Sequence, residues 1–201
     1  LTAQQLLNRI EIITNGSIVG RFFPFWPTRD VDLIHWLSHW IAKGAVPVAL
    51  LNIQKVPDNH HKLDMWQHQM IHGVAPRGIL LRNPIELQTP QRLYEQLTSD
   101  SQILIRRYDI IQRYTPQTNL CQLTKFNDTT WRKMNVLGQV VNVLREEKQV
   151  NDNEVRGVYY RPSVNYIRIP SSCVPGITIY VRRYSQTHKD LLDAAELPFK
   201  S

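Results

Sequence analysis

The sequence predicts an α+β fold in which helices pack on a mainly antiparallel sheet. Apolar residues recur at helical spacing over residues 2–14, and Asn15-Gly16 supplies the stop expected after such a helix. Residues 46–53 are a short run of strand-forming residues. Residues 66–72 and 78–81 flank a tight turn, which predicts a hairpin and therefore antiparallel pairing.

The remaining elements follow from the same kinds of signal. Thr28, Asp30 and Asp32 resemble a helix start, and the apolar stripe that follows closes at Gly44. Three more helices are expected, from the Thr89-Pro90 cap to Leu97, from the Asp128 cap to Glu147, and over 187–197. Further strands are expected over 101–105, 166–170 and 176–181. The segments expected to be irregular are the aromatic, proline-rich residues 22–27, residues 115–130, and a turn over 149–154.

Length and composition limit the class of protein. With 201 residues, 42% of them hydrophobic and 20% charged, the chain is globular and long enough for one or two domains. No apolar run approaches the roughly 20 residues of a membrane helix, and the N-terminal residues lack the pattern of a secretory signal. Two cysteines do not make a disulfide framework, so a reducing, cytoplasmic location without a membrane partner is expected.

The formal net charge of +7 is concentrated in the second half of the chain. Residues 1–100 hold nine Lys and Arg against eight Asp and Glu, whereas residues 101–201 hold fifteen against nine. Basic pairs in this half suit an acidic protein surface or phosphates, but such pairs are usually solvated, which disfavours nucleic-acid binding. These pairs are Arg106-Arg107, Arg132-Lys133 and Arg182-Arg183.

His68 and Asn83 are the candidate catalytic residues. His68 lies on the first strand of the predicted hairpin, and Asn83, followed by Pro84, ends the second. A neutral imidazole can take a proton from a nucleophile once a neighbour fixes its tautomer, and a carboxamide can do this. The pair fits two members of a Cys-His-Asn site, but a structural histidine on a half-buried strand fits equally well. His72, four residues further along, is either a supporting residue or a rival for the role.

The nucleophile of such a site is expected outside the 201 residues. Cys121 and Cys173 both follow the pair, and neither obviously opens a helix, where the pKa of a thiol would be lowered. Both are interpreted as structural or incidental unless the chain order is permuted. Because the chain begins at Leu1 already within a predicted helix, we interpret it as a fragment whose thiol precedes Leu1.

No metal or cofactor is expected. His35 and His39 have the spacing at which two imidazoles share a metal, but position 36 is Trp where the zinc-peptidase pattern has Glu, so packing is the favoured interpretation. His60-His61 lie in a polar loop and could complete a metal site only in space. No glycine-rich phosphate loop is present.

The order of helix, buried strand, histidine strand and Asn-Pro resembles the C-terminal half of the papain-like fold in the bacteriocin-leader peptidase group. In that pattern a Gly follows the catalytic His by about five residues and Asp-Pro or Asn-Pro ends the next strand. Here Gly73 follows His68 by five residues and Asn83 follows it by fifteen. The resemblance implies that His68 is the base and Asn83 its orienter. This chain departs from the pattern in having Asn for the commoner Asp and Gln69 for an apolar residue.

That match covers residues 45–85, and a later segment carries a second resemblance. Residues 166–178, together with the basic bias, resemble the eukaryotic basic immunoglobulin-like variable motif-containing proteins. The resemblances imply that residues 1–114 are the histidine/asparagine half of a papain-like domain. Residues 115–201 would then be a basic extension of it.

The function implied is that of a cysteine peptidase-type domain that hydrolyses an amide or isopeptide bond through a thioester. The alternative keeps the fold without the chemistry, because fold alone does not establish function. It is a noncatalytic scaffold or interaction module whose basic second half and aromatic segments bind an acidic protein partner within a larger assembly.

Overall fold

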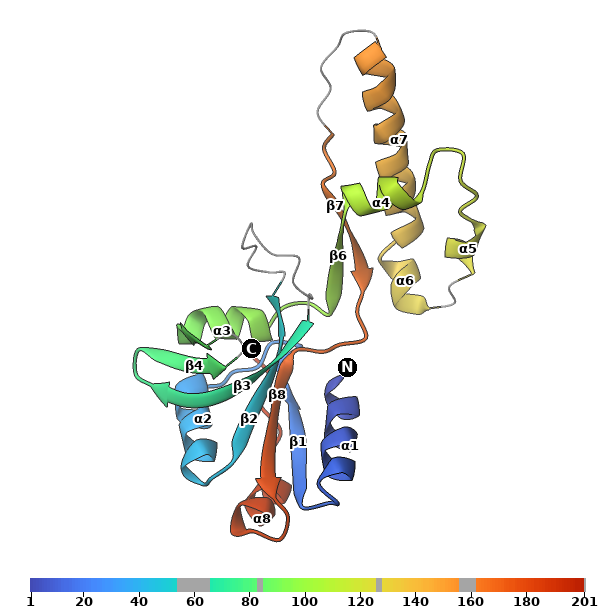
Figure 1. Ribbon diagram of the computed structural model, residues 1–201. Coiled ribbons are helices and arrows are strands. Elements are labelled where there is room, and N and C mark those ends of the chain that lie inside the picture. Colours follow the sequence, from blue (N-terminus) through green and yellow to red (C-terminus); the bar gives the residue numbers. More distant parts are fainter. Residues whose placement is uncertain (54–65, 83–84, 126–127, 156–161, 201) are drawn as a thin grey trace. The chain divides into compact units, whose positions relative to one another are not determined.

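The structure is a computed structural model that describes residues 1–53, 66–82, 85–125, 128–155 and 162–200. The chain divides into two compact units, which are described separately (Figure 1). The first unit combines residues 1–101 with residues 172–201, and the second spans residues 102–171. Within the described ranges, no helix has the length and apolar character needed to cross a membrane.

The first unit is built on a six-stranded antiparallel sheet. Its described elements are α1 (Ala3–Ile13), β1 (Ile18–Pro24), α2 (Leu33–Ala42), β2 (Val46–Asn52), β3 (Trp66–Ala75), β4 (Gly78–Arg82), β5 (Ile85–Gln88), α3 (Pro90–Leu97), β8 (Gly176–Arg182) and α8 (Gln186–Asp193). The strand order is β1-β8-β2-β3-β4-β5, so β8 lies between β1 and β2 (Figure 1). Residues from the two ends of the chain therefore pair within one sheet.

One face of this sheet carries the main hydrophobic core, which α2, α3 and α8 cover. Successive side chains of a strand point to opposite faces, so alternate residues reach this core. Phe23 of β1, Leu51 of β2 and Ile179 of β8 are fully buried there. The ring of Phe23 meets that of Trp36 in α2 edge to face, with 5.3 Å between centroids.

The opposite face of the sheet is covered by α1 at strands β1 and β8. Gly20 of β1 pairs with Tyr180 of β8. A Cβ atom at Gly20 would lie 2.8 Å from both Leu7 of α1 and Tyr180, so glycine lets the helix lie close on the sheet. The helix starts with a capping box, in which Thr2 Oγ1 accepts from the Gln5 amide at 3.2 Å and the Thr2 amide donates to Gln5 Oε1 at 2.9 Å.

The second unit packs a two-stranded antiparallel sheet against its longest helix (Figure 1). Its described elements are β6 (Gln102–Arg106), α4 (Arg107–Arg113), α5 (Cys121–Thr124), α6 (Thr129–Lys133), α7 (Val136–Val155) and β7 (Tyr166–Pro170). Ile105 pairs with Ile167, and both belong to a cluster with Val140 and Val143 of α7. This cluster is the core of the unit.

Arg107 joins α4 to α7 and to the segment before β7. Its guanidinium donates to Glu146 Oε2 at 2.9 Å, to Glu147 Oε2 at 2.7 Å and to the Val164 carbonyl at 3.3 Å. Burial alone would raise the pKa of the Glu146 carboxyl. Hydrogen bonds from Ser163, Val164 and the guanidinium outweigh burial and hold this pKa below its ordinary value of 4.5.

The α+β class and the mainly antiparallel sheet are confirmed. Helices α1, α2 and α3 and strands β2, β3, β4, β6, β7 and β8 lie where the sequence predicts them, with boundaries shifted by a few residues. The side chains of Asp32 and Thr89 cap α2 and α3. Local sequence signals were sufficient for these elements.

The helix expected from Asp128 to Glu147 is wrong at both ends. Asp128 caps only the short α6, Asn135 adopts a left-handed φ of 49°, and α7 starts at Val136. Helix α7 continues to Val155, so the turn expected over 149–154 is wrong as well. Asn and Asp disfavour a helix by only fractions of a kcal/mol per residue, which a helix already packed on its core outweighs.

Sequence analysis missed β1 and β5, and it missed α4 and α5 in the second unit. Strand β1 is an edge strand, where Pro24 can be tolerated. The last helix, expected to reach Leu197, ends at Asp193. The division between residues 114 and 115 assigned a papain-like half and an extension, and that assignment stays a prediction. In the structure, residues 172–201 belong to the first unit because β8 pairs with both β1 and β2.

Replacing Arg107 with methionine should lower the free energy of unfolding of the second unit by about 2 kcal/mol, because two half-buried carboxylates would lose their shared guanidinium. Hydrogen exchange of the α7 amides measures this change. The stabilisation from Glu146 should be complete above pH 4.5 and be lost as the pH falls through its lowered pKa.

The exposed neighbour supplies the control for this prediction. Arg106→Met should change the same free energy by no more than about 0.5 kcal/mol. Equal losses in the two variants would contradict a specific role for Arg107.

Candidate functional site

His68 lies on the sheet face that α1 covers. In β3 it pairs directly with Leu50 of β2, which pairs in turn with Gly176 of β8. Directly paired residues of antiparallel strands share a face, and Gly176 shares its face with Tyr180, four residues along the strand. Tyr180 faces α1 beside Gly20, so the His68 side chain points to the α1 side of the sheet.

The environment of His68 suits a base. Its side chain is half-buried, and Nε2 has no hydrogen-bond partner among the described residues. Burial, the largest cause, lowers the pKa of His68 below its ordinary value of 6.5. The imidazole is therefore neutral at pH 7, and Nε2 can accept a proton in the tautomer that carries its hydrogen on Nδ1.

The start of α1 lies at the same end of the sheet as His68, since Leu1 contacts Cys173 just before β8, and Gly176 at the start of β8 lies in one row with Leu50 and His68. Cys173, in the loop before β8, donates from Sγ to the Leu1 carbonyl at 3.9 Å. The first backbone N–H groups of a helix carry partial positive charge and favour a thiolate or an oxyanion. This end of the sheet therefore brings a neutral base close to an anion-stabilising helix start.

Two residues at this end were not selected from the sequence as site residues. Cys173, which was interpreted as structural or incidental, reaches the start of α1 through the placement of β8. Asn52 pairs with Trp66 at the end of β2, which makes Asn52 and His68 diagonal neighbours on one face. Asn52 is buried, and its Nδ2 donates to the Asp100 carbonyl at 3.4 Å. A polar residue ending an apolar strand was the signal that could have identified it.

The predicted partner of His68 cannot be placed beside it. Asn83 lies outside the described residues, together with Pro84 and the loop histidines His60 and His61. The pairing of His68 with Asn83 therefore stays a prediction.

The other candidate histidines within the described residues, His35, His39 and His72, are exposed. The register of β3 shifts between Ile71 and Gly73, so His72 lies in a β-bulge and the simple alternation that would place it beside His68 is broken. His35 and His39 lie on α2, which packs on the core face of the sheet. Within the described residues, no three His, Cys, Asp or Glu side chains are grouped to hold a metal ion.

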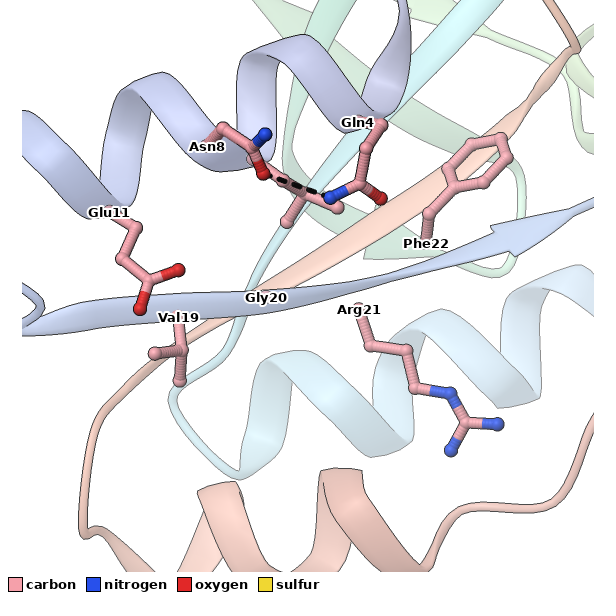
Figure 2. Close-up of a pocket in the computed structure, with 8 residues that line it drawn as sticks. Gln4, Asn8, Glu11, Val19, Gly20, Arg21 and Phe22 are labelled. Carbon is pink, nitrogen blue, oxygen red and sulfur yellow. Dashed lines mark hydrogen bonds between the residues drawn. The ribbon is translucent and has the colours of Figure 1, made fainter.

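A shallow pocket of about 410 Å³ lies between α1 and β1 (Figure 2). Gln4 and Asn8 form its helix side and are joined by a hydrogen bond of 2.9 Å. Arg21 points away from α1 and pairs with Glu196 at 2.7 Å. Glu11 is held in a second ion pair, so both charged residues of the pocket lining are used by the fold.

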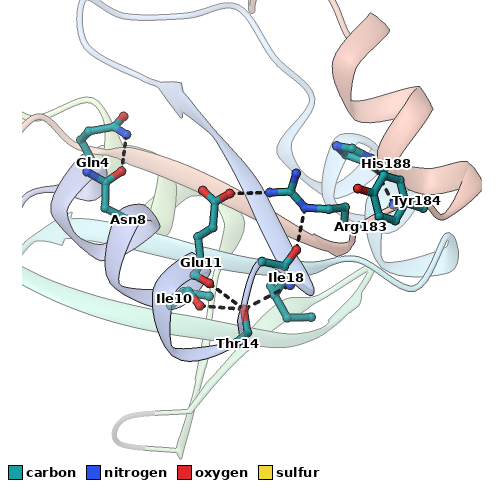
Figure 3. A network of polar contacts seen from close by, with 10 residues as sticks. Gln4, Asn8, Ile10, Glu11, Thr14, Ile18, Arg183, Tyr184 and His188 are labelled. Atoms are coloured by element: carbon teal, nitrogen blue, oxygen red, sulfur yellow. Dashed lines mark hydrogen bonds and ion pairs between the residues drawn. The ribbon is translucent and has the colours of Figure 1, made fainter.

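That second ion pair joins Glu11 to Arg183 (Figure 3). The Arg183 guanidinium also donates from Nε to the Gly16 carbonyl at 2.6 Å. Close by, the Tyr184 amide donates to His188 Nδ1 at 3.3 Å. Arg183 therefore connects α1 to the end of β8. In the sequence analysis it belonged to a basic pair that was considered for binding an acidic partner.

Comparison of the chain with protein-family models, with curated proteins and with solved structures gives no match. The structure defines an α+β protein with a six-stranded antiparallel sheet. The resemblance to papain-like peptidases therefore rests on the sequence motif, and what it implies is carried forward as a proposal.

The His68 imidazole should titrate below 6.5 in the folded chain. The unfolded chain then binds the proton more readily, so the contribution of His68 to the free energy of unfolding should be complete above pH 6.5 and fall as the pH drops toward the lowered pKa. An NMR titration of the imidazole protons, repeated in urea, measures both midpoints. In His68→Gln this part of the pH dependence should disappear, and a folded midpoint at or above 6.5 would contradict the assignment.

Proposed function

We propose that the first unit is the histidine-bearing half of a papain-like cysteine peptidase-type domain that hydrolyses an amide or isopeptide bond. The observation that supports it best is the position of His68, a neutral base with an unpartnered, buried Nε2 close to the start of α1. A papain-like site needs such an imidazole beside a thiol at a helix start. The resemblance at residues 45–85 supports the same assignment.

In the proposed reaction, His68 Nε2 takes the thiol proton while the sulfur bonds to the carbonyl carbon of the substrate. Backbone N–H groups at the helix start stabilise the negative charge that develops on the carbonyl oxygen. The C–N bond then breaks, the imidazolium returns the proton to the leaving amine, and a thioester remains. Water attacks the thioester after losing a proton to the same imidazole, which releases the acid and restores the thiol.

The proposal assigns the thiol to a residue preceding Leu1 and the orientation of His68 to Asn83. Asn52 is a second candidate for the orienting carboxamide, supported by its diagonal position beside His68. Cys173 is less well supported as the nucleophile, because it lies in a loop and not at a helix start.

A second candidate function is a noncatalytic papain-fold module that binds an acidic protein partner. It is supported by the way the two units use their basic residues. In the first unit, Arg21, Lys43, Arg92 and Arg183 each pair with a carboxylate. The first unit also exposes Arg9, Arg77, Arg82 and Arg182. The second unit, residues 102–171, holds eleven Lys and Arg against six Asp and Glu, and its exposed basic residues include Arg106, Arg113, Lys133, Arg145, Lys148 and Arg168.

A thiol placed at the start of α1 should be activated by His68. In a chain whose Cys121 and Cys173 are replaced by serine, Leu1→Cys should react with iodoacetamide near neutral pH about tenfold faster than the same variant carrying His68→Ala. The reason is that the imidazole takes the thiol proton and stabilises the thiolate. Pseudo-first-order labelling rates followed by mass spectrometry measure this ratio.

The start of α3 supplies a matched control for this experiment. Thr89→Cys in the same background also places a thiol at a helix start, but on a helix that packs on the core face of the sheet. Its labelling rate should be unchanged by His68→Ala. Equal labelling of Leu1→Cys with and without His68 would count against His68 as the base of this site.

A further inference from the structure

The sheet of the second unit presents two arginines and a tyrosine on the face turned away from α7. Its register pairs Arg106 with Tyr166 and Leu104 with Arg168. Residues that alternate with these, such as Ile167, are buried against α7. Because neighbours along a strand point to opposite faces, Leu104, Arg106, Tyr166 and Arg168 share the other face. We call these four residues the outer ribbon face.

The outer ribbon face is cationic and accessible. Arg106 and Arg168 are exposed, and neither forms an ion pair with a described residue. Tyr166 is 46% exposed. Arg107, next in sequence to Arg106, is instead buried with two carboxylates. Guanidinium groups remain protonated at physiological pH, so the charge of this face is permanent.

Helix α7 secures the backbone of this face at Arg168. Gln139 accepts from the Arg168 amide at 2.8 Å and donates to the Arg168 carbonyl at 2.9 Å. Gln139 also donates to the Met134 carbonyl at 2.8 Å. A side-chain amide thus occupies the outer backbone edge of β7 at this residue, where an added strand would otherwise pair. A partner is therefore expected to contact the side chains of the face.

The composition of the outer ribbon face fits a protein partner better than a nucleic acid. Arginine and tyrosine are enriched at the centres of protein interfaces, whereas lysine is depleted, and this face holds two arginines and no lysine. Each guanidinium can bind a carboxylate through two parallel hydrogen bonds. Leu104 has no side-chain group for a phosphate or a base edge, but it can contact an apolar side chain.

We propose that the outer ribbon face binds a short acidic segment of a partner protein, in which carboxylates are combined with apolar side chains. The inference rests on the second candidate function and places its binding surface. It does not involve His68. Its test measures peptide binding, whereas the Leu1→Cys labelling experiment measures thiol reactivity. Failure of one leaves the other result intact.

Fluorescence anisotropy with the full 201-residue chain tests the inference. The probe is a fluorescein-labelled peptide in which glutamate alternates with leucine. The double substitution Arg106→Gln with Arg168→Gln should weaken its binding about tenfold or more, since two charge-assisted contacts are lost while the aliphatic stems remain on the strands. Tyr166→Ser, measured separately, should also weaken binding and keeps the test decisive if the double variant fails to fold.

The matched control changes the same charge elsewhere in the second unit. Arg145→Gln with Lys148→Gln removes two exposed cations from α7 and should leave the affinity within about twofold of the unsubstituted chain. Circular dichroism establishes that each variant is folded. A peptide in which lysine alternates with leucine should not bind.

Three outcomes would overturn the inference. Equal weakening by the ribbon and α7 substitutions would show general charge attraction without a site on the ribbon. Tighter binding of a labelled oligothymidine than of the acidic peptide would make the surface a nucleic-acid site. Absence of peptide binding by the unsubstituted chain would remove both this inference and the second candidate function.

Discussion

The insertion of β8 between β1 and β2 is the constraint on which the first unit depends. β8 pairs with both neighbours, and its residues from Gly176 to Val181 are buried. The core is therefore completed only when the end of the chain returns to the sheet. The position of His68 also depends on β8, because Gly176 of β8, Leu50 of β2 and His68 of β3 are directly paired across the sheet. A Cβ atom at Gly176 would collide with the Phe23 carbonyl and the Phe22 ring, so this position in β8 requires glycine. Both the pairing of β8 with β1 and the placement of His68 therefore require glycine at position 176.

The same residue type has different chemistry at different places in this sheet. His68 is half-buried and loses solvation for its charged form, whereas His35 and His39 sit on the exposed side of a helix. Several buried polar side-chain atoms of the described residues lack a hydrogen-bond partner, but among them only His68 Nε2 belongs to an imidazole, which can accept a proton near neutral pH. This is why His68, and not its neighbours in sequence, carries the proposed chemistry.

The arginines of the basic pairs also differ in role, since one member of a pair can stabilise the fold while the other is exposed. Arg107 and Arg183 each bind a carboxylate and a backbone carbonyl, and so hold secondary-structure elements together. Their neighbours Arg106 and Arg182 are exposed. A basic pair in the sequence therefore overstates the charge that is available to a partner. The larger part of the positive surplus is on the second unit, where residues 102–171 hold eleven Lys and Arg against six Asp and Glu.

Much of the fold could be predicted from short stretches of sequence. The Thr89-Pro90 cap, the apolar spacing of α1 and the hairpin of β3 and β4 are contained within a few residues, and each formed as expected. His68 was selected as a candidate from its place on the predicted hairpin and its spacing to Gly73 and Asn83. Its suggested partner Asn83 came from a motif, and the described residues do not include it.

The amino-acid sequence by itself determined the local elements, the charge asymmetry and the candidate histidine, because these depend on periodicity, caps and residue type. Only the tertiary structure decided that β8 joins the first sheet, that Asn52 lies diagonal to His68 and that Arg106 is exposed while Arg107 is buried. Each of these depends on contacts between residues far apart in the chain. Which distant strands pair is settled by the total apolar surface that the assembled sheet can bury, and no short stretch of sequence contains that quantity.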